Sequence, residues 1–102
     1  MNACGVGSSM GEESKLEKWA RDEIFEAGGW MLKWASPGQK GVPDNIIFWP
    51  GNVIHLAEFK ALDGDTEYMQ THVIKALREF GATVLEPRNK DFLQTYIDQY
   101  HK

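Results

Sequence analysis

Cysteine is nearly absent from this chain of 102 residues, and it contains no long apolar run. The single cysteine, Cys4, can form neither an internal disulfide nor a cysteine-based metal site. No apolar stretch approaches the length needed to span a bilayer, and the N-terminus lacks a basic segment followed by a hydrophobic one. We therefore expect an intracellular protein without disulfides and without contact to a membrane.

Basic charge is also scarce, because 11 lysines and arginines stand against 15 aspartates and glutamates, for a net charge of −4. Domains that bind nucleic acid usually carry a basic face, so composition alone does not indicate such a partner. Acids that hold divalent cations would make the working protein less negative. The basic residues are scattered, and we expect these on solvated surface: Lys33, Lys40, Lys75, Arg78, Arg88 and Lys90.

The length is that of one domain, since a chain this short buries only ~60–65% of its unfolded surface. Residues 1–13, "MNACGVGSSMGEE", are rich in glycine and serine and are predicted to form a mobile tail. Residues 14–102 are predicted to form the domain.

Apolar periodicity predicts a first helix from Ser14 to Ala27, with Ser14 and Glu17 as a capping box and Gly28 as its end. Strands, a second helix, a short strand and a third helix follow. Their ranges are Trp30–Ala35, a hairpin within Gly41–Lys60, a helical stripe of Met69, Val73, Ala76, Leu77 and Phe80, the strand Ala82–Glu86, and a helix with Phe92, Tyr96, Ile97 and Tyr100. The order α-β-β-β-α-β-α predicts an α/β fold with a mixed sheet flanked by helices.

The hairpin places two acids face to face. If its loop is the three residues 50–52, then Trp49 pairs with Val53, and antiparallel counting sets Asp44 opposite Glu58. Like charges in that position lie ~4.5–5.5 Å apart at Cβ and destabilise the sheet, so we expect a cation nearby. A two-residue loop would send the acids to opposite faces. Asn52 tolerates the left-handed conformation that an odd loop often needs.

Lys60 projects from the same face as Glu58, which leaves two interpretations open. One is a structural ion pair, which the spacing alone favours because such triplets arise by chance in many strands. The other is a divalent cation held by Asp44 and Glu58, with Lys60 beside the attacking water. Paired carboxylates suit a hard, oxygen-preferring ion such as Mg²⁺ or Mn²⁺.

Several motifs occur together and in order along the chain. They are "SPGQKGVPD" (Ser36–Asp44), "EFK" (Glu58–Lys60), Gln70, and "FGATVLEP" (Phe80–Pro87). This set resembles the PD-(D/E)xK nuclease superfamily and, within it, the VRR-NUC (virus-type replication-repair nuclease) domain, from Ser14 onward. The resemblance implies a restriction-endonuclease-like fold.

The resemblance also implies roles for particular residues. Asp44 and Glu58 would ligate the metal together with the backbone carbonyl of Phe59, and Lys60 would lie near the attacking water. Glu17 matches the acid that the family carries on its first helix and is a further possible ligand.

Gln70 matches the glutamine that the family carries on the helix after the ExK strand. Ordinary explanations remain beside these roles, because Glu17 would serve a capping box and Gln70 could be solvated. Other acids of the first helix, Glu12, Glu13 and Glu23, compete for the place of Glu17. Lys40 is the best candidate for a phosphate contact.

The implied function is that of a Mg²⁺- or Mn²⁺-dependent DNA endonuclease that hydrolyses phosphodiester bonds, selective for branched DNA such as four-way (Holliday) junctions in DNA repair. Small phage members of the family look like homodimers, so the resemblance implies a homodimer. A phage-encoded protein would act in the cytoplasm of the host cell. The alternatives are a catalytically silent DNA-binding or dimerisation module on the same fold, or a nuclease acting on other DNA or on RNA.

The remaining aromatic residues and histidines point to packing rather than catalysis. His55 faces away from Glu58 and is predicted to be packed or to face a partner, while His72 is expected on the surface. Four tryptophans and a hairpin that is apolar on both faces exceed what so small a core needs, which favours a homodimer.

Overall fold

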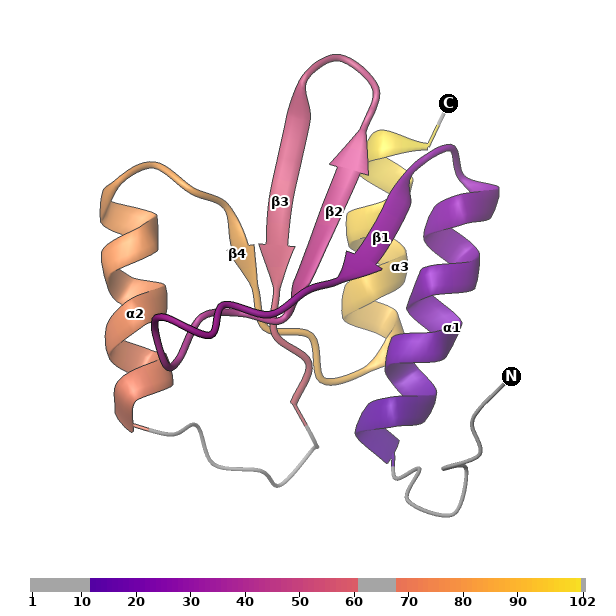
Figure 1. Cartoon of the computed structure of the whole chain (residues 1–102). Coiled ribbons are helices and arrows are strands. Elements are labelled where there is room, and N and C mark those ends of the chain that lie inside the picture. Colours follow the sequence, from indigo (N-terminus) through magenta and orange to yellow (C-terminus); the bar gives the residue numbers. More distant parts are fainter. Residues whose placement is uncertain (1–11, 61–67, 102) are drawn as a thin grey trace.

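The structure, a computed structural model, describes residues 12–60 and 68–101. Within them the chain forms helices and strands in the predicted order (Figure 1). These elements are α1 (Glu12–Glu26), β1 (Trp30–Lys33), β2 (Asn45–Trp49), β3 (Val53–Ala57), α2 (Tyr68–Glu79), β4 (Val84–Leu85) and α3 (Lys90–Tyr100). Most of the predicted tail, including Cys4, lies outside the described residues, and α1 begins two residues before the predicted boundary at Ser14.

The four strands form one mixed sheet in the order β1-β2-β3-β4, as expected. β2 is antiparallel to both β1 and β3, whereas β3 and β4 run parallel. The parallel pair continues beyond the short β4, because the backbone N–H groups of Glu58 and Lys60 donate to the carbonyls of Leu85 (2.9 Å) and Pro87 (3.0 Å). The segment that carries Glu58 and Lys60 is therefore held by the sheet.

The hairpin has the predicted three-residue loop. Trp49 pairs with Val53 and Ile47 with His55, and Asn52 adopts a left-handed φ of 68°. Strands β1 and β3 end, and β2 begins, at one end of the sheet (Figure 1). The hairpin turn lies at the other end. Asp44, before β2, and Glu58, after β3, consequently lie at the end of the sheet away from the turn.

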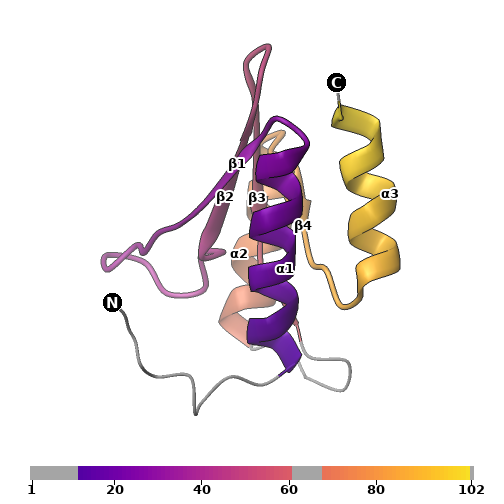
Figure 2. The same cartoon turned by 90° about the vertical axis from the view of Figure 1, so that its right-hand side faces the viewer.

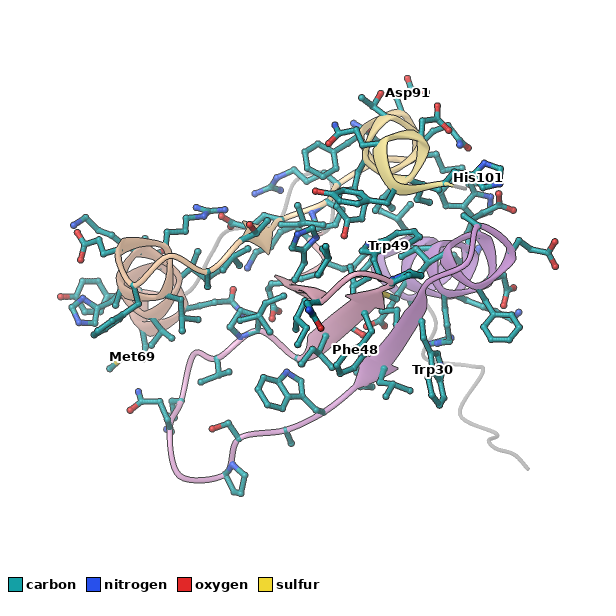
Figure 3. The ribbon with its side chains drawn as sticks, turned by 90° about the horizontal axis from the view of Figure 1, so that it is seen from above. Trp30, Phe48, Trp49, Met69, Asp91 and His101 are labelled. Carbon is teal, nitrogen blue, oxygen red and sulfur yellow. The ribbon has the colours of Figure 1, made fainter. Side chains whose placement is uncertain are left out.

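Helices α1 and α3 lie side by side over one face of the sheet, and α2 stands apart beside β4 (Figures 1 and 2). Trp49 points toward α1 and α3, while Trp30 and Phe48 point to the opposite side (Figure 3). The core between helices and sheet is built from Leu16, Ala20, Ile24, Ala27, Met31, Ile47, Trp49, Ala57, Phe59, Leu93, Tyr96 and Ile97. The other side, which we name the open sheet face, consists of Trp30, Leu32, Ile46, Phe48, Ile54 and Leu56.

Two local predictions were wrong. Ser14 lies inside α1, so it does not cap the helix, and Glu17 is not part of a capping box. In α2 the most buried side chain is Ile74, which the predicted stripe omitted, whereas Phe80 follows the helix and is 91% exposed. Because α2 packs at the edge of the sheet beside β4, only a narrow strip of it is covered. In the described part of the chain, no helix combines the length and apolar character that a bilayer crossing requires.

Candidate active site

Asp44 and Glu58 meet at the end of the sheet away from the hairpin turn. Asp44 directly precedes β2 and Glu58 directly follows β3, so they continue the register whose last pair is Asn45 with Ala57. The backbone N–H of Asp44 donates to Glu58 Oε1 over 3.2 Å. The predicted juxtaposition of the two acids is confirmed.

The environment of Glu58 disfavours its charge. Burial raises the pKa of Glu58, and the neighbouring charge of Asp44 raises it further. Hydrogen bonds from the Gln70 side chain and the Asp44 backbone, together with the charge of Lys60, oppose that rise without cancelling it. The two acids thus repel each other as the register implied.

Lys60 and Gln70 form a linked pair beside Glu58. The ammonium of Lys60, only 6% of whose residue surface is exposed, donates to Gln70 Oε1. Since the Gln70 side chain also hydrogen-bonds to Glu58, it connects the lysine to the acid. The sequence prediction placed these three residues together, and in the structure they are together.

Gly41 explains why Gln70 lies there. Its φ is +87°, and a Cβ at this position would lie 2.7 Å from Met69 O and 3.0 Å from Gln70 N. The loop before Asp44 therefore packs directly on the first turn of α2, at a distance that only glycine permits. The GVPD sequence thus places Gln70 as well as Asp44.

Glu17 reaches the same end of the sheet from α1. It follows Leu16 on the buried side of the helix and is 9% exposed. Asn45 Nδ2 donates to Glu17 Oε2 over 2.6 Å and to Asp44 Oδ1 over 3.0 Å, so the buried Asn45 amide bridges the two acids. Among the first-helix acids whose side chains the structure describes, Glu17 contacts the strand ends, whereas Glu23 lines a separate surface hollow.

Lys33 was expected on solvated surface, and its side chain is indeed exposed, but it also belongs to the candidate site. Its ammonium donates to both oxygens of Glu17, at 2.8 and 3.0 Å, and lies 3.6 Å from Asp44 Oδ2. Burial lowers the pKa of Lys33, but the hydrogen bond and charge of Glu17 and the charge of Asp44 raise it above the ordinary value. The cation in contact with Asp44 thus comes from β1 and not from Lys60.

Sequence reasoning missed both Lys33 and Asn45. The two residues are paired in the β1–β2 register, and Asn45 directly follows Asp44. The adjacency of Asn45 to the GVPD sequence was the available signal, because a buried amide in a strand needs polar partners.

The donor atoms at this site fit a hard divalent cation. Asp44 and Glu58 offer carboxylate oxygens, and the N–H of Lys60 donates to Pro87 O, which holds the Phe59–Lys60 peptide that carries the Phe59 carbonyl. Both Glu17 oxygens are engaged by Lys33 and Asn45 in this arrangement. Across residues 12–60 and 68–101, no three acidic, histidine or cysteine side chains converge into a ready-made metal cage. The fit therefore rests on the paired acids and their mutual repulsion.

The other predicted residues lie outside this cluster. Lys40 is exposed in the loop before Gly41. His55 is buried, with its Nδ1 2.6 Å from the hydroxyl of Tyr96, which confirms that it is packed. His72 is exposed on α2 beside the ring of Tyr68, as expected.

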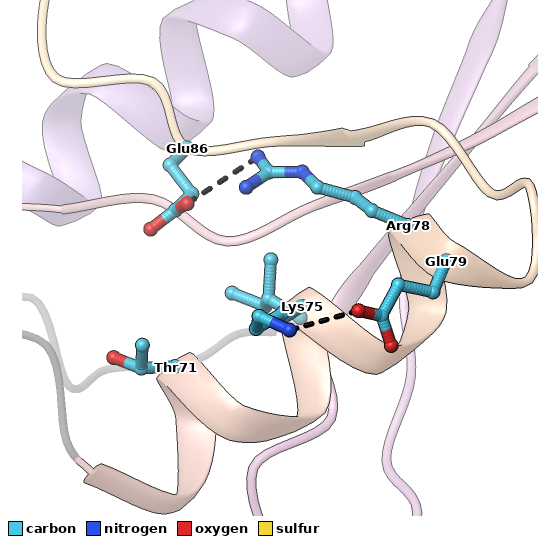
Figure 4. A pocket seen from close by; sticks show the side chains of 6 residues that line it. Thr71, Lys75, Arg78, Glu79 and Glu86 are labelled. Carbon is cyan, nitrogen blue, oxygen red and sulfur yellow. Dashed lines mark hydrogen bonds and ion pairs between the residues drawn. The ribbon is translucent and has the colours of Figure 1, made fainter.

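A pocket of about 340 Å³ lies between α2 and the segment after β4 (Figure 4). Its charged side chains are paired, Arg78 with Glu86 at 3.3 Å and Lys75 with Glu79 at 2.8 Å. None of the predicted site residues lines it. Its balanced charge gives no reason to place an anion there.

Comparison with known proteins decides the fold. A solved structure described as a VRR_NUC domain matches with a TM-score of 0.80, covering 89% of this chain and 99% of that one at 24% identity. The chain has the VRR_NUC fold. This match confirms the restriction-endonuclease-like arrangement of a mixed sheet flanked by helices.

A phage protein is similar to this chain in amino-acid sequence. "Putative nuclease p44" of Acyrthosiphon pisum secondary endosymbiont phage 1 is 39% identical over 49 residues, which are 48% of this chain and 53% of that protein. The matched region thus spans about half the length of that relative. No family model matches the chain.

Proposed function

We propose that this chain is a Mg²⁺- or Mn²⁺-dependent endonuclease that hydrolyses phosphodiester bonds in DNA. The observation that carries the proposal is the assembly of Asp44, Glu58, Lys60 and Gln70 at one end of the sheet on a VRR_NUC fold. A scaffold that only bound DNA or a partner would have no use for two adjacent acids that repel each other.

In the proposed reaction, Asp44 and Glu58 hold the cation, with the backbone carbonyl of Phe59 as a further ligand. The bound ion would lower the pKa of water and stabilise negative charge on the phosphate and the leaving oxygen. Asn45 fixes the orientation of Asp44 through the hydrogen bond to Oδ1.

Lys60 supplies a buried positive charge beside the reacting phosphate and water, and Gln70 holds its ammonium in place. Water attacks phosphorus as the bond to the leaving sugar oxygen breaks, and the proton lost by water is balanced by the one gained by that oxygen. Lys40, exposed next to the loop glycine, is a candidate to contact a neighbouring phosphate.

The substrate is proposed to be branched DNA, such as a four-way junction, as in DNA repair. The test is incubation with four-way, flap, single-stranded and linear duplex DNA of one sequence, each with Mn²⁺ and with EDTA. We expect Mn²⁺-dependent cleavage that is fastest on the junction. No cleavage of any DNA would favour the silent binding module, and equal cleavage of all four would remove the preference for branches.

We further propose a homodimer formed through the open sheet face. Trp30 and Ile54 on this face are each 56% exposed, and Ile46, Phe48 and Leu56 beside them are only half-buried. An apolar surface of this kind typically marks an interface, and a two-fold axis is the simplest way for it to cover itself. Two active sites in fixed relation would suit paired cuts in a symmetric junction.

Light scattering at micromolar concentration tests the dimer. The wild-type chain should have the mass of two copies, and Trp30→Glu should shift the mass to one copy. Phe80→Glu is the matched control, because Phe80 is the more exposed aromatic but lies outside the open sheet face. A monomeric wild type would favour a nuclease that makes single nicks.

A further inference from the structure

We propose that Lys33 is a tethered counter-ion, which a divalent cation must displace from Asp44 and which thereby sets the metal concentration at which the site fills. This inference rests on the proposed function, because it concerns the same metal site. It assigns a role to a residue outside the motifs that predicted the site.

The contacts of Lys33 are unequal. Its ammonium is held closely by both oxygens of the buried Glu17, at 2.8 and 3.0 Å, whereas Asp44 Oδ2 is 3.6 Å away. Asn45 joins Glu17 to Asp44, so the two acids keep their spacing when the lysine moves. The ammonium can therefore give up Asp44 while it stays attached to Glu17.

Moving Lys33 away from Asp44 costs little free energy, but the charge of Lys33 still opposes metal binding. The Lys33 side chain is 56% exposed, and exposed ion pairs contribute little, so giving up the longer contact costs little. Its positive charge nevertheless stays close to the ligands and repels an entering divalent ion. Coulomb repulsion between a single and a double positive charge ~6 Å apart in a water-like dielectric weakens metal binding about tenfold.

Calorimetric titration with Mn²⁺ tests the proposal on wild type, Lys33→Met, Lys33→Gln and Lys33→Arg. The glutamine variant can still hydrogen-bond to Glu17, so it serves if the methionine variant fails to fold. Lys75→Met is the matched control, since it removes the same charge from another 2.8 Å lysine–glutamate pair outside the site.

Lys33→Met and Lys33→Gln should bind Mn²⁺ about tenfold more tightly than wild type. Lys33→Arg and Lys75→Met should keep the wild-type Kd within about twofold. A purely structural lysine would lower the melting temperature without tightening metal binding. An unchanged or higher Kd in a folded Lys33→Gln overturns the inference, and a wild type that binds no Mn²⁺ overturns the proposed metal site as well.

A double variant separates the two acids that Lys33 contacts. If Glu17 only anchors the lysine, then adding Glu17→Asp to Lys33→Met, which keeps the charge but shortens the side chain, should leave the Mn²⁺ affinity at the tightened value. A return to the wild-type affinity would mean that released Glu17 had become a ligand, and the claim that Lys33 competes for Asp44 would be wrong.

Discussion

Two clusters of polar side chains in this chain differ in how their partly or fully buried groups are paired. In the core, Tyr96 OH accepts from Trp49 Nε1 at 2.7 Å and lies 2.6 Å from His55 Nδ1, while Tyr100 stacks on Trp49 with ring centroids 5.4 Å apart. At the strand ends, the charge of Asp44 disfavours the charge of Glu58. Lys33, at the end of β1, and Lys60, in the segment after β3, lie beside these acids.

The core cluster contributes to stability, whereas the strand-end cluster serves the proposed function. The core cluster uses neutral groups whose donors and acceptors match, which is how buried polar groups normally stabilise a fold. The strand-end cluster holds like charges together, an arrangement that destabilises a protein unless a cation completes it. Substitutions in the first cluster should therefore affect folding, and substitutions in the second should affect catalysis.

Asp44→Asn should give the largest effect. We expect loss of Mn²⁺-dependent cleavage by about a thousandfold or more, because one of the two carboxylate ligands loses its charge. Circular dichroism should show an unchanged fold. The control is Tyr96→Phe in the core cluster, which should keep the rate per folded molecule. An Asp44→Asn protein that cleaves as fast as wild type would remove the site.

Lys60→Ala should lower the cleavage rate by about a hundredfold, as expected when one preorganised charge is removed from a transition state. The Mn²⁺ affinity measured by calorimetry should not fall, because an ammonium ligates no metal and its positive charge opposes cation binding. If metal binding disappears together with cleavage, Lys60 supports the ligands instead of the reaction.

Tyr96→Phe should destabilise the fold. It leaves Trp49 Nε1 and His55 Nδ1 buried without their common partner, a loss of about 1–3 kcal/mol in unfolding free energy. Urea denaturation provides the measurement. The Mn²⁺ affinity should not change, and a large change would show that the two clusters are coupled.

The two clusters should respond oppositely to acid. Burial lowers the pKa of His55 below 6.5, so its contribution to stability is complete above pH 6.5 and is lost as the pH falls through the folded pKa. The pKa of Glu58 is raised above 4.5, so its destabilising charge is relieved as the pH falls through the folded pKa.

Urea denaturation in EDTA at pH 7.5 and 5.0 measures this contrast. Between these values His55→Gln should lose less stability than wild type, and Glu58→Gln should lose more. Identical pH dependence in all three proteins would contradict the assigned pKa directions.

The sequence predicted the parts of the site that local rules determine. A three-residue loop and strict alternation fixed the register of β2 and β3, and with it the pairing of Asp44 and Glu58. Lys33 could not be placed in this way, because β1 and β2 are joined by a long loop that imposes no register. Its contacts with Glu17 and Asp44 depend on packing of α1 against the sheet.

The errors in the helices have a common physical cause. The predicted stripe of α2 assumed that large apolar residues are buried, yet Phe80 is exposed and Ile74 carries the contact with the sheet. Helix α2 packs beside an edge strand, so apolar spacing alone cannot say which narrow strip is covered. Likewise, the Ser14–Glu17 spacing matched a capping box although the helix begins earlier.

The central claim is that the strand-end acids are arranged for a cation, and melting curves of wild type and Glu58→Gln in rising Mn²⁺ test it most directly. In EDTA the variant should melt higher, because it lacks the disfavoured charge of Glu58. As Mn²⁺ rises, the wild type should gain stability by mass action and overtake the variant, which should stay flat. Two curves that remain parallel across the titration would contradict the account.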